Sequence, residues 1–225
     1  MKIVKSYIKF YHYLFKNLFD VMKTISCMNI DESLLYSFGA EDRDYKKREA
    51  VFREEDHALY YFQISEGKVK LNNYNENGKE FIHNILGRKQ SFGEAMLFLN
   101  QKYPINAICL EDSRIIRLPK NNFFEMITQN PDLSLEMNAC FSQEIFYKLK
   151  MVQSLASENP MQRLKGLLEY LKSYHDEDCQ KCFHIEFTRQ QIANLTGMRV
   201  ETVIRTLKKM EKEGSIILKD RKILY

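Results

Sequence analysis

Two charged residues near the C-terminus, Glu201 and Arg205, stand four positions apart in a stretch whose apolar residues recur with a helical period. That spacing puts both side chains on one face of a helix. An arginine can donate two hydrogen bonds to guanine O6 and N7, and a glutamate can accept one from cytosine N4. The pair is therefore typical of a helix that reads a G·C base pair, although many surface helices carry an i, i+4 ion pair of the same types.

The residues before this pair have the pattern of a helix-turn-helix. Thr188 can cap a helix over residues 189–195. Gly197 stands where a tight turn between two helices requires a left-handed backbone. A second helix is expected to begin near Arg199, with Val203 on its inward face.

A basic hairpin is expected after the second helix. Apolar runs at residues 216–218 and 222–225 flank Lys219-Asp220-Arg221, which predicts a two-stranded wing and hence a winged helix-turn-helix. The last forty residues hold nine Lys and Arg against five Asp and Glu, an excess equal to the net charge of +4 of all 225 residues. A basic segment on a near-neutral body favours an anionic partner, most commonly nucleic acid.

A second constellation lies just upstream, with the spacing His-x₃-Cys-x₂-Cys-x-His. Its weak candidate metal ligands are His175, Cys179, Cys182 and His184. Cys-x₂-Cys is a good zinc spacing, and the same two thiols can form a redox switch. The chain has no second Cys-x₂-Cys pair, so an acidic surface loop with unreactive thiols is the third interpretation.

The composition is that of a globular protein, with 44% hydrophobic residues, 28% charged residues, eight Gly and four Pro. These values exclude a collagen-like or largely disordered chain. Five cysteines are an odd number and favour reduced thiols, so we expect a cytoplasmic protein. No run of 18 apolar residues occurs, so no membrane span or membrane partner is expected. The helical apolar stripe over residues 8–22 is typical of core packing, with a membrane-surface helix as the alternative.

From about residue 37 to residue 118 the pattern changes to that of strands. Residues 68–72 alternate polar and apolar, Asn77-Gly78 favours a type I′ turn, and residues 81–86 form the returning strand. Further short strands are expected at residues 59–64, 107–110 and 114–118. Several short strands separated by regular turns predict an antiparallel roll or sandwich.

Helices are expected to follow Pro119, a short one over residues 122–128 and a long one that Pro131 opens. The long helix carries a continuous apolar seam at Met137, Phe141, Ile145, Leu149 and Val152. A second stripe, at Leu133, Cys140, Phe146 and Leu155, can face the helix's own domain. Two apolar faces favour a helix that serves both the fold and a partner helix, with a single buried helix as the alternative.

The chain resembles the Crp/Fnr superfamily of bacterial transcription regulators along nearly its whole length. The resemblance rests on LYYFQISEGKVKL, SFGEAMLF, AICLEDSRIIRLP and FTRQQIANLTGMRVETVIRTLKKME, whose Val-Glu-Thr-x-x-Arg recognition helix is of the Fnr-like version. It implies an α+β fold with an N-terminal antiparallel β-roll of the cyclic-nucleotide-binding type, which is a double-stranded jelly roll. The implied segments are N-terminal helices (1–36), the β-roll effector domain (37–130), a dimerisation helix (131–156) and a winged helix-turn-helix (157–225).

The same resemblance implies a function. The family's members are not enzymes, and they bind inverted-repeat promoter sites in double-stranded DNA as homodimers, with RNA polymerase as a partner. It implies a TTGA/TCAA-type repeat whose bases are read by Val200, Glu201 and Arg205. The residues expected to face phosphate are Thr188, Arg189, Arg199, Thr202 and Lys208.

The chain departs from the family's two best-known sensing devices. An Fnr-type iron–sulfur cluster needs several N-terminal cysteines, and only Cys27 is present, so no cluster is expected. Gly93-Glu94 matches the cyclic-nucleotide cassette, but its phosphate-binding arginine position holds Pro104 and the next position Ile105. Cyclic AMP is therefore not expected as a tight effector, and the effector is otherwise unspecified. The candidate pocket consists of Gly93, Glu94, Tyr103, Pro104, Ile105 and Asn106.

Three alternative functions can be weighed against this one. A redox-, haem- or metal-responsive regulator would use Cys179 and Cys182 or the β-roll pocket. A cupin-type enzyme would need a His-x-His pair, and the five histidines include none. A sensing module without DNA binding is disfavoured because Glu201 and Arg205 are present.

Overall fold

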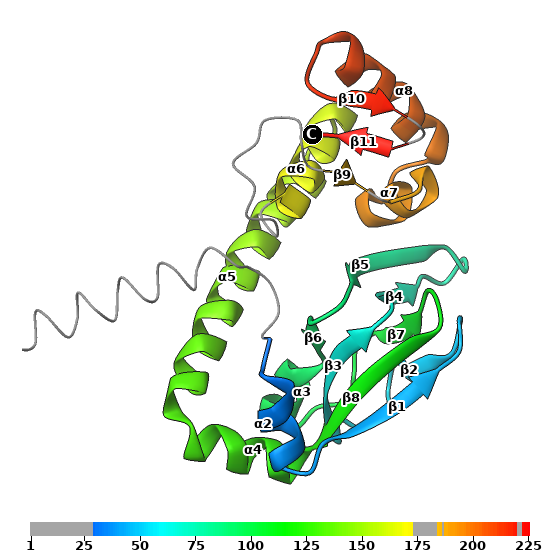
Figure 1. Cartoon of the computed structure of the whole chain (residues 1–225). Coiled ribbons are helices and arrows are strands. Elements are labelled where there is room, and N and C mark those ends of the chain that lie inside the picture. The colour runs from blue at the N-terminus through cyan, green and yellow to red at the C-terminus, as the bar shows by residue number, and fades with distance from the viewer. Residues whose placement is uncertain (1–28, 173–183, 186, 220–221) are drawn as a thin grey trace, which may run out of the picture. The chain divides into compact units, whose positions relative to one another are not determined.

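The computed structural model describes residues 29–172, 184–185, 187–219 and 222–225 (Figure 1). The contacts among residues divide the chain into two compact units, one built on residues 27–131 and 188–203 and the other on residues 132–187 and 204–225. The apolar stripe expected over residues 8–22 lies outside the described residues. Among the helices of the described ranges, none has the length and apolar composition that a membrane span requires.

The first unit contains an antiparallel β-roll of two four-stranded sheets. Its strands are β1 (Glu41–Tyr45), β2 (Ala50–Phe52), β3 (Tyr60–Glu66), β4 (Val69–Tyr74), β5 (Glu80–Leu86), β6 (Ser91–Phe92), β7 (Asn106–Cys109) and β8 (Ser113–Pro119). One sheet has the order β1-β8-β3-β6 and the other β2-β7-β4-β5, with antiparallel neighbours throughout. The short helices are α2 (Glu32–Ser37), α3 (Glu94–Leu99) and α4 (Lys120–Gln129). The predicted β-roll is confirmed.

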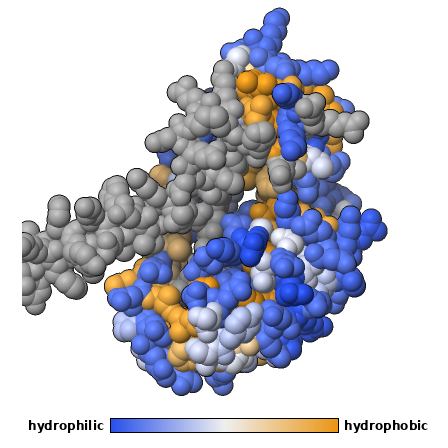
Figure 2. Space-filling view, viewed as in Figure 1, coloured by the Kyte–Doolittle hydropathy of each residue, from blue (hydrophilic) through white to orange (hydrophobic). Residues whose placement is uncertain are grey.

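The central strands β3 and β8 supply much of the core of this unit. Ile64 lies opposite Ile115 and Tyr61 opposite Leu118, and all four side chains are fully buried. Aromatic and β-branched residues favour strands because they pack well on a pleated, half-buried surface. The outer surface is mostly hydrophilic on the face in view, with a few apolar areas (Figure 2).

The turn between β4 and β5 differs from the predicted type. A type I′ turn needs a positive φ at both central residues, but of the pair Asn77-Gly78 only the glycine has one (70°). Instead, the Asn75 side-chain oxygen accepts hydrogen bonds from the backbone N–H groups of Asn77 (3.1 Å) and Lys79 (2.9 Å). The asparagine side chain thus stabilises a longer loop, which closes with the glycine in the left-handed region.

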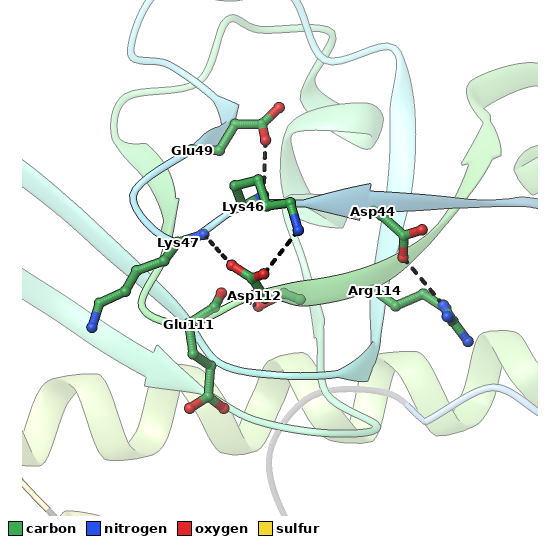
Figure 3. Close-up of polar contacts among 8 residues, drawn as sticks. Asp44, Lys46, Lys47, Glu49, Glu111, Asp112 and Arg114 are labelled. Carbon is green, nitrogen blue, oxygen red and sulfur yellow. Dashed lines mark hydrogen bonds and ion pairs between the residues drawn. The ribbon is translucent and has the colours of Figure 1, made fainter.

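Polar contacts join the β1–β2 loop to the β7–β8 loop (Figure 3). The Asp112 carboxylate accepts a hydrogen bond from the Lys47 backbone N–H (2.9 Å) and pairs with the Lys46 ammonium (2.9 Å). Nearby, Arg114 on β8 pairs with Asp44 on β1 (3.3 Å). The Lys47 N–H, followed by the Lys46 side chain, lowers the pKa of the Asp112 carboxyl below its ordinary value.

Two helices begin the second unit. Helix α5 (Pro131–Leu155) has 25 residues and is about 37 Å long, and α6 (Pro160–Lys172) follows a short connection. Both start with proline, which is tolerated in a first turn because its missing N–H has no partner there. The apolar face of α6 is buried as the spacing predicts, through Leu164, Leu167, Leu168 and Leu171.

The C-terminal elements are helices α7 (Arg189–Thr196) and α8 (Val200–Lys212) and strands β9 (His184–Ile185), β10 (Ile217–Lys219) and β11 (Lys222–Leu224). The expected hairpin is present as the antiparallel pair β10–β11. A third strand, β9, was not predicted from the sequence, and it pairs with β11 through Ile185 opposite Ile223. Both isoleucines are buried, so apolar side chains of the three-stranded sheet contribute to the core.

Candidate nucleic-acid interface

Helix α7 begins with a capping box. The Thr188 side-chain oxygen accepts a hydrogen bond from the Gln191 backbone N–H (3.1 Å), and the Gln191 side chain accepts one from the Thr188 N–H (2.8 Å). Such reciprocal bonds satisfy two N–H groups that a helix start leaves without partners. The predicted cap is confirmed, and the Thr188 hydroxyl hydrogen remains available as a donor to phosphate.

A tight turn joins α7 to α8. Gly197 ends α7 with φ 67° in the left-handed region, and an added Cβ atom there would meet nothing within 4 Å. The position therefore favours glycine because of its backbone conformation and not because of crowding. Met198 is buried at the turn, and α8 begins at Val200, one residue after the predicted start.

Helix α8 has a buried face and a polar outer face. Val203 and Leu207 are buried, as their i, i+4 spacing predicts, and Met210 at i+7 is buried with them. Glu201 and Arg205 are both exposed on the outer face. Among the described residues neither of these two side chains has a hydrogen-bond or ion-pair partner, so the i, i+4 ion pair that the sequence allowed is not formed. Their carboxylate and guanidinium groups are free to bind a ligand.

The residues expected to face phosphate surround these two. Arg199 and Lys208 are exposed, and Thr202 is half-buried on α8. Arg189, in the first turn of α7, is half-buried, and this desolvation lowers the pKa of its guanidinium. An arginine starts from so high a pKa that it keeps its charge at neutral pH.

One exposed residue was missed by the sequence reasoning. Ile204 is exposed on α8 between Glu201 and Arg205. It lies about 100° around the helix from Val203 and about 60° from Leu207, so helical period places it at the edge of the buried face. Valine at position 200, the predicted third base-reading residue, is half-buried one turn earlier.

The candidate effector pocket of the β-roll is filled by aromatic side chains. The rings of Phe52 and Tyr103 stack with centroids 3.6 Å apart, and Phe62 and Phe92 lie next to Phe52. Gly93, with φ 85°, touches both stacked rings, since an added Cβ would come within 3.1 Å of Tyr103 and 3.3 Å of Phe52. Burial, followed by the charge of a nearby carboxylate, raises the pKa of the Tyr103 hydroxyl.

Two further residues of the predicted pocket, Asn106 and Glu94, form hydrogen bonds within the fold. The Asn106 side chain accepts from the Glu54 N–H (3.1 Å) and donates to the Asn72 carbonyl oxygen (3.1 Å). Glu94 is buried and accepts a hydrogen bond from the Ser91 hydroxyl (3.0 Å). Pro104 is exposed and Ile105 is half-buried. This set holds no cation within the described residues that could neutralise a phosphate.

The predicted seam of α5 divides into a buried and an exposed part. Met137 is buried within the chain itself, so the seam is not exposed along its whole predicted length. Ile145, Leu149 and Val152 are 59–61% exposed, and Phe141 is half-buried. Phe146, assigned to the stripe that would face its own domain, is exposed as well. The second half of α5 therefore presents a broad apolar surface.

The Cys-x₂-Cys constellation is almost wholly outside the described residues. Three of its members, His175, Cys179 and Cys182, are not described, and the backbone of the fourth, His184, lies in β9. The metal and redox interpretations of this set stay predictions.

Two family models match the chain. Residues 42–130 match the cyclic nucleotide-binding domain, and residues 162–225 match the Crp-like helix-turn-helix domain. Electron transport regulator A of Shewanella oneidensis is 27% identical over 80% of this chain and 72% of its own length. Transcriptional activator protein anr of Pseudomonas aeruginosa is 24% identical over 80% of this chain and 75% of its own length.

Solved structures share the fold. A CooA variant from Carboxydothermus hydrogenoformans has a TM-score of 0.71 at 19% identity and covers 87% of this chain and 88% of its own. The c-di-GMP-responsive global regulator CLP of Xanthomonas campestris has a TM-score of 0.65 at 19% identity, with coverages of 86% and 98%. The β-roll, the Crp-like helix-turn-helix and these relatives together show that the chain belongs to the Crp/Fnr superfamily of bacterial transcription regulators.

Proposed function

We propose that this regulator binds an inverted-repeat DNA site of the TTGA/TCAA type as a homodimer, and that Val200, Glu201 and Arg205 read its bases. The observation that carries the proposal is the outer face of α8, where a carboxylate and a guanidinium are exposed four residues apart and have no partner among the described residues. These are the groups that bind cytosine N4 and guanine O6 and N7 in a major groove.

The residues around this face suit contacts to the DNA backbone. Arg199 and Lys208 carry exposed charges on either side of the base-reading pair. Thr188, Arg189 and Thr202 supply further donors near the starts of α7 and α8. Contacts of this kind set the position of the protein on the duplex but carry no sequence information of their own.

The second half of α5 supports the dimer. Ile145, Leu149 and Val152 expose large apolar side chains at i, i+4 and i+7, which is the pattern of a helix that packs on another helix. A two-fold pair of such helices would remove these side chains from water in both copies. A homodimer also matches the symmetry of an inverted repeat.

We infer that cyclic AMP is not the tight effector. The stacked rings of Phe52 and Tyr103 occupy the interior next to Gly93. Lys102, the nearest cation in sequence, pairs with Glu55 (3.3 Å) at the surface. A buried cyclic phosphate needs a paired cation, so this pocket does not suit it. The effector that acts on the β-roll or on α5 would shift the population of orientations of the two winged helices.

The expected setting follows from promoter binding. A DNA-bound regulator of this kind acts in the bacterial cytoplasm, with RNA polymerase as its protein partner.

Binding to two labelled duplexes tests the proposal. One duplex carries the inverted repeat and the other a scrambled sequence of the same composition, and fluorescence anisotropy is measured at two salt concentrations. We expect roughly a thousandfold or greater preference for the repeat, with a steep loss of affinity for both duplexes as salt rises. Equal affinity for the two duplexes would contradict sequence-specific binding.

A further inference from the structure

Helix α7 is buried on more than one side. All residues from 192 to 196 are buried, although a surface helix normally buries a single apolar stripe. Asn194 is only 7% exposed, yet it lies about 160° around the helix from Ile192 and about 100° from Leu195, the apolar residues of the stripe. Its burial is explained by β5, against which α7 packs within the compact unit that also contains the β-roll.

The partner of Asn194 is the carboxylate of Glu80 on β5. The Asn194 amide donates a hydrogen bond to Glu80 Oε2 (3.0 Å). The other oxygen, Oε1, accepts hydrogen bonds from the Lys70 ammonium and the Asn72 amide of β4. On α7, the Gln190 amide donates to the side-chain oxygen of Asn194 (2.9 Å) and so orients it. The Glu80 side chain is 18% exposed, so this charge-assisted network is largely shielded from water.

The same β4–β5 hairpin makes a second contact at the turn between α7 and α8. The Lys79 ammonium donates to the backbone carbonyl oxygen of Gly197 (3.1 Å). This carbonyl stands two residues before Arg199 and three before Val200, where α8 begins. A recognition helix inserts its N-terminal residues into the major groove, so the turn before it lies close to the DNA backbone. The hairpin and a DNA duplex therefore compete for the space at this turn.

We propose that the β4–β5 hairpin is an autoinhibitory latch, which holds α7 through Glu80 and the turn through Lys79 and must release both before DNA binds. The inference rests on the proposed function and adds to it a contact within the chain that opposes DNA binding. DNA that binds only the released state has its apparent affinity reduced by the fraction of chains that are latched. Weakening the latch therefore raises affinity for DNA, whereas loss of a DNA contact lowers it.

Asn194→Asp breaks the latch and at the same time works against the general electrostatics of DNA binding. The new carboxylate faces that of Glu80, and two like charges at hydrogen-bonding distance repel each other. An added negative charge by itself weakens binding to every duplex. We nevertheless expect Asn194→Asp to bind the inverted repeat about tenfold or more tightly than the unchanged protein in fluorescence anisotropy, the value of one hydrogen bond to a charged group.

A reversal of donor and acceptor provides the matched control. In the double variant Glu80→Gln/Asn194→Asp, the new amide at position 80 can donate to the new carboxylate at position 194, while its oxygen still accepts from Lys70 and Asn72. The net charge is that of the unchanged protein, and affinity should return to about its original value. Glu76→Gln, in the exposed loop of the hairpin, should change affinity for the repeat and for a scrambled duplex by the same small factor.

Hydrogen exchange reports on the latch in the absence of DNA. The backbone N–H groups of β5 and α7 should exchange faster in Asn194→Asp than in the unchanged protein, and at the original rate in the double variant. Circular dichroism establishes that each variant is folded. Asn194→Ala removes the same hydrogen bond without a new charge, and it should show the same gain in affinity if Asn194→Asp does not fold.

The outcomes separate the latch from the function on which it rests. A folded Asn194→Asp that binds the repeat no more tightly than the unchanged protein overturns the latch, and so does a double variant that keeps the gain. Identical exchange rates in all three proteins overturn it as well. Failure of the unchanged protein and of Asn194→Asp alike to prefer the repeat over a scrambled duplex overturns the proposed function, and the exchange rates then decide the contact on their own.

Discussion

The side chains of the β-roll interior and those of the outer face of α8 differ in whether they make contacts within the fold. In the β-roll, Asn106 binds backbone groups of its own fold and Tyr103 stacks on Phe52, so the cassette position is filled by the chain. On α8, Glu201 and Arg205 are exposed and have no partner among the described residues. Groups satisfied within the fold contribute to stability, while groups left free are available for recognition.

The contrast indicates that the resemblance to the family extends to function in α8 more clearly than in the β-roll. The β-roll keeps the family's fold, but the position where the resemblance places the phosphate-binding arginine holds Pro104, and Phe52 stacks on Tyr103 beside Gly93. Helix α8 exposes Glu201 and Arg205, the residues that we propose read the bases, and neither has a partner among the described residues. Helix α5 resembles α8 in this respect, because its apolar side chains Ile145, Leu149 and Val152 are also exposed in the single chain.

The largest expected effect comes from a charge on the exposed part of α5. Ile145→Glu would place two like charges in an apolar interface between two copies, and buried unpaired charges are strongly destabilising. Sedimentation should then report monomers, and affinity for the inverted repeat should collapse.

Gln143→Glu is the control, because it adds the same charge about 200° around the helix from Ile145. It should leave the protein dimeric. A dimeric Ile145→Glu variant would mean that the interface lies elsewhere.

Phe52 is buried in the β-roll, so the loss of its ring should lower stability strongly. Phe52→Ala removes a ring that stacks on Tyr103 and touches Phe62 and Phe92, so it should lower the free energy of unfolding by about 3–5 kcal/mol in chemical denaturation. Leu99→Ala, at a side chain that is 61% exposed, should change it by less than about 0.5 kcal/mol. Equal, small effects would show that the ring lines an open pocket.

A smaller effect is expected at the contacts between the β1–β2 and β7–β8 loops. The lowered pKa of Asp112 means that its carboxylate stabilises the fold above about pH 4 and that this contribution is lost as pH falls through the lowered pKa. Asp112→Asn should therefore have a slightly lower Tm than the unchanged protein at pH 7, and the two Tm values should converge once the pH falls below the lowered pKa. A Tm difference that is constant with pH would assign the effect to packing.

The smallest expected effect is that of cyclic nucleotides, for which we expect none. Calorimetric titration with cyclic AMP and cyclic GMP should give no binding at micromolar concentrations, because the loss of the charge-assisted pair weakens affinity by roughly a thousandfold or more. Micromolar binding of either nucleotide would show that a cation elsewhere replaces the missing arginine and that the aromatic stack opens.

Periodicity predicted the elements that local sequence determines. The β-roll strands, the long helix and the cap at Thr188 follow from residue types a few positions apart. Features that depend on distant partners were not predictable in this way. Strand β9 is two residues long and exists because it pairs with β11, and Phe52 stacks on a tyrosine 51 positions away.

The prediction of a type I′ turn at Asn77-Gly78 was wrong for a different reason. The dipeptide favours a type I′ turn, but the side chain of Asn75 binds two backbone N–H groups and selects a longer loop. For the candidate site, helical period and residue type predicted the outward direction of Glu201 and Arg205. Whether they form an ion pair with each other could not be predicted from the sequence, and the structure shows that they do not.

The central claim, that the free groups of α8 read a G·C pair, is tested most directly by combining Arg205→Ala with changes of that base pair. The unchanged protein should lose about 1–3 kcal/mol, or about 5- to 150-fold in affinity, when the pair is replaced, and Arg205→Ala should bind all four versions alike. Lys208→Ala should keep the discrimination while its salt slope falls by about one. An Arg205→Ala variant that still discriminates among the four base pairs would contradict the claim.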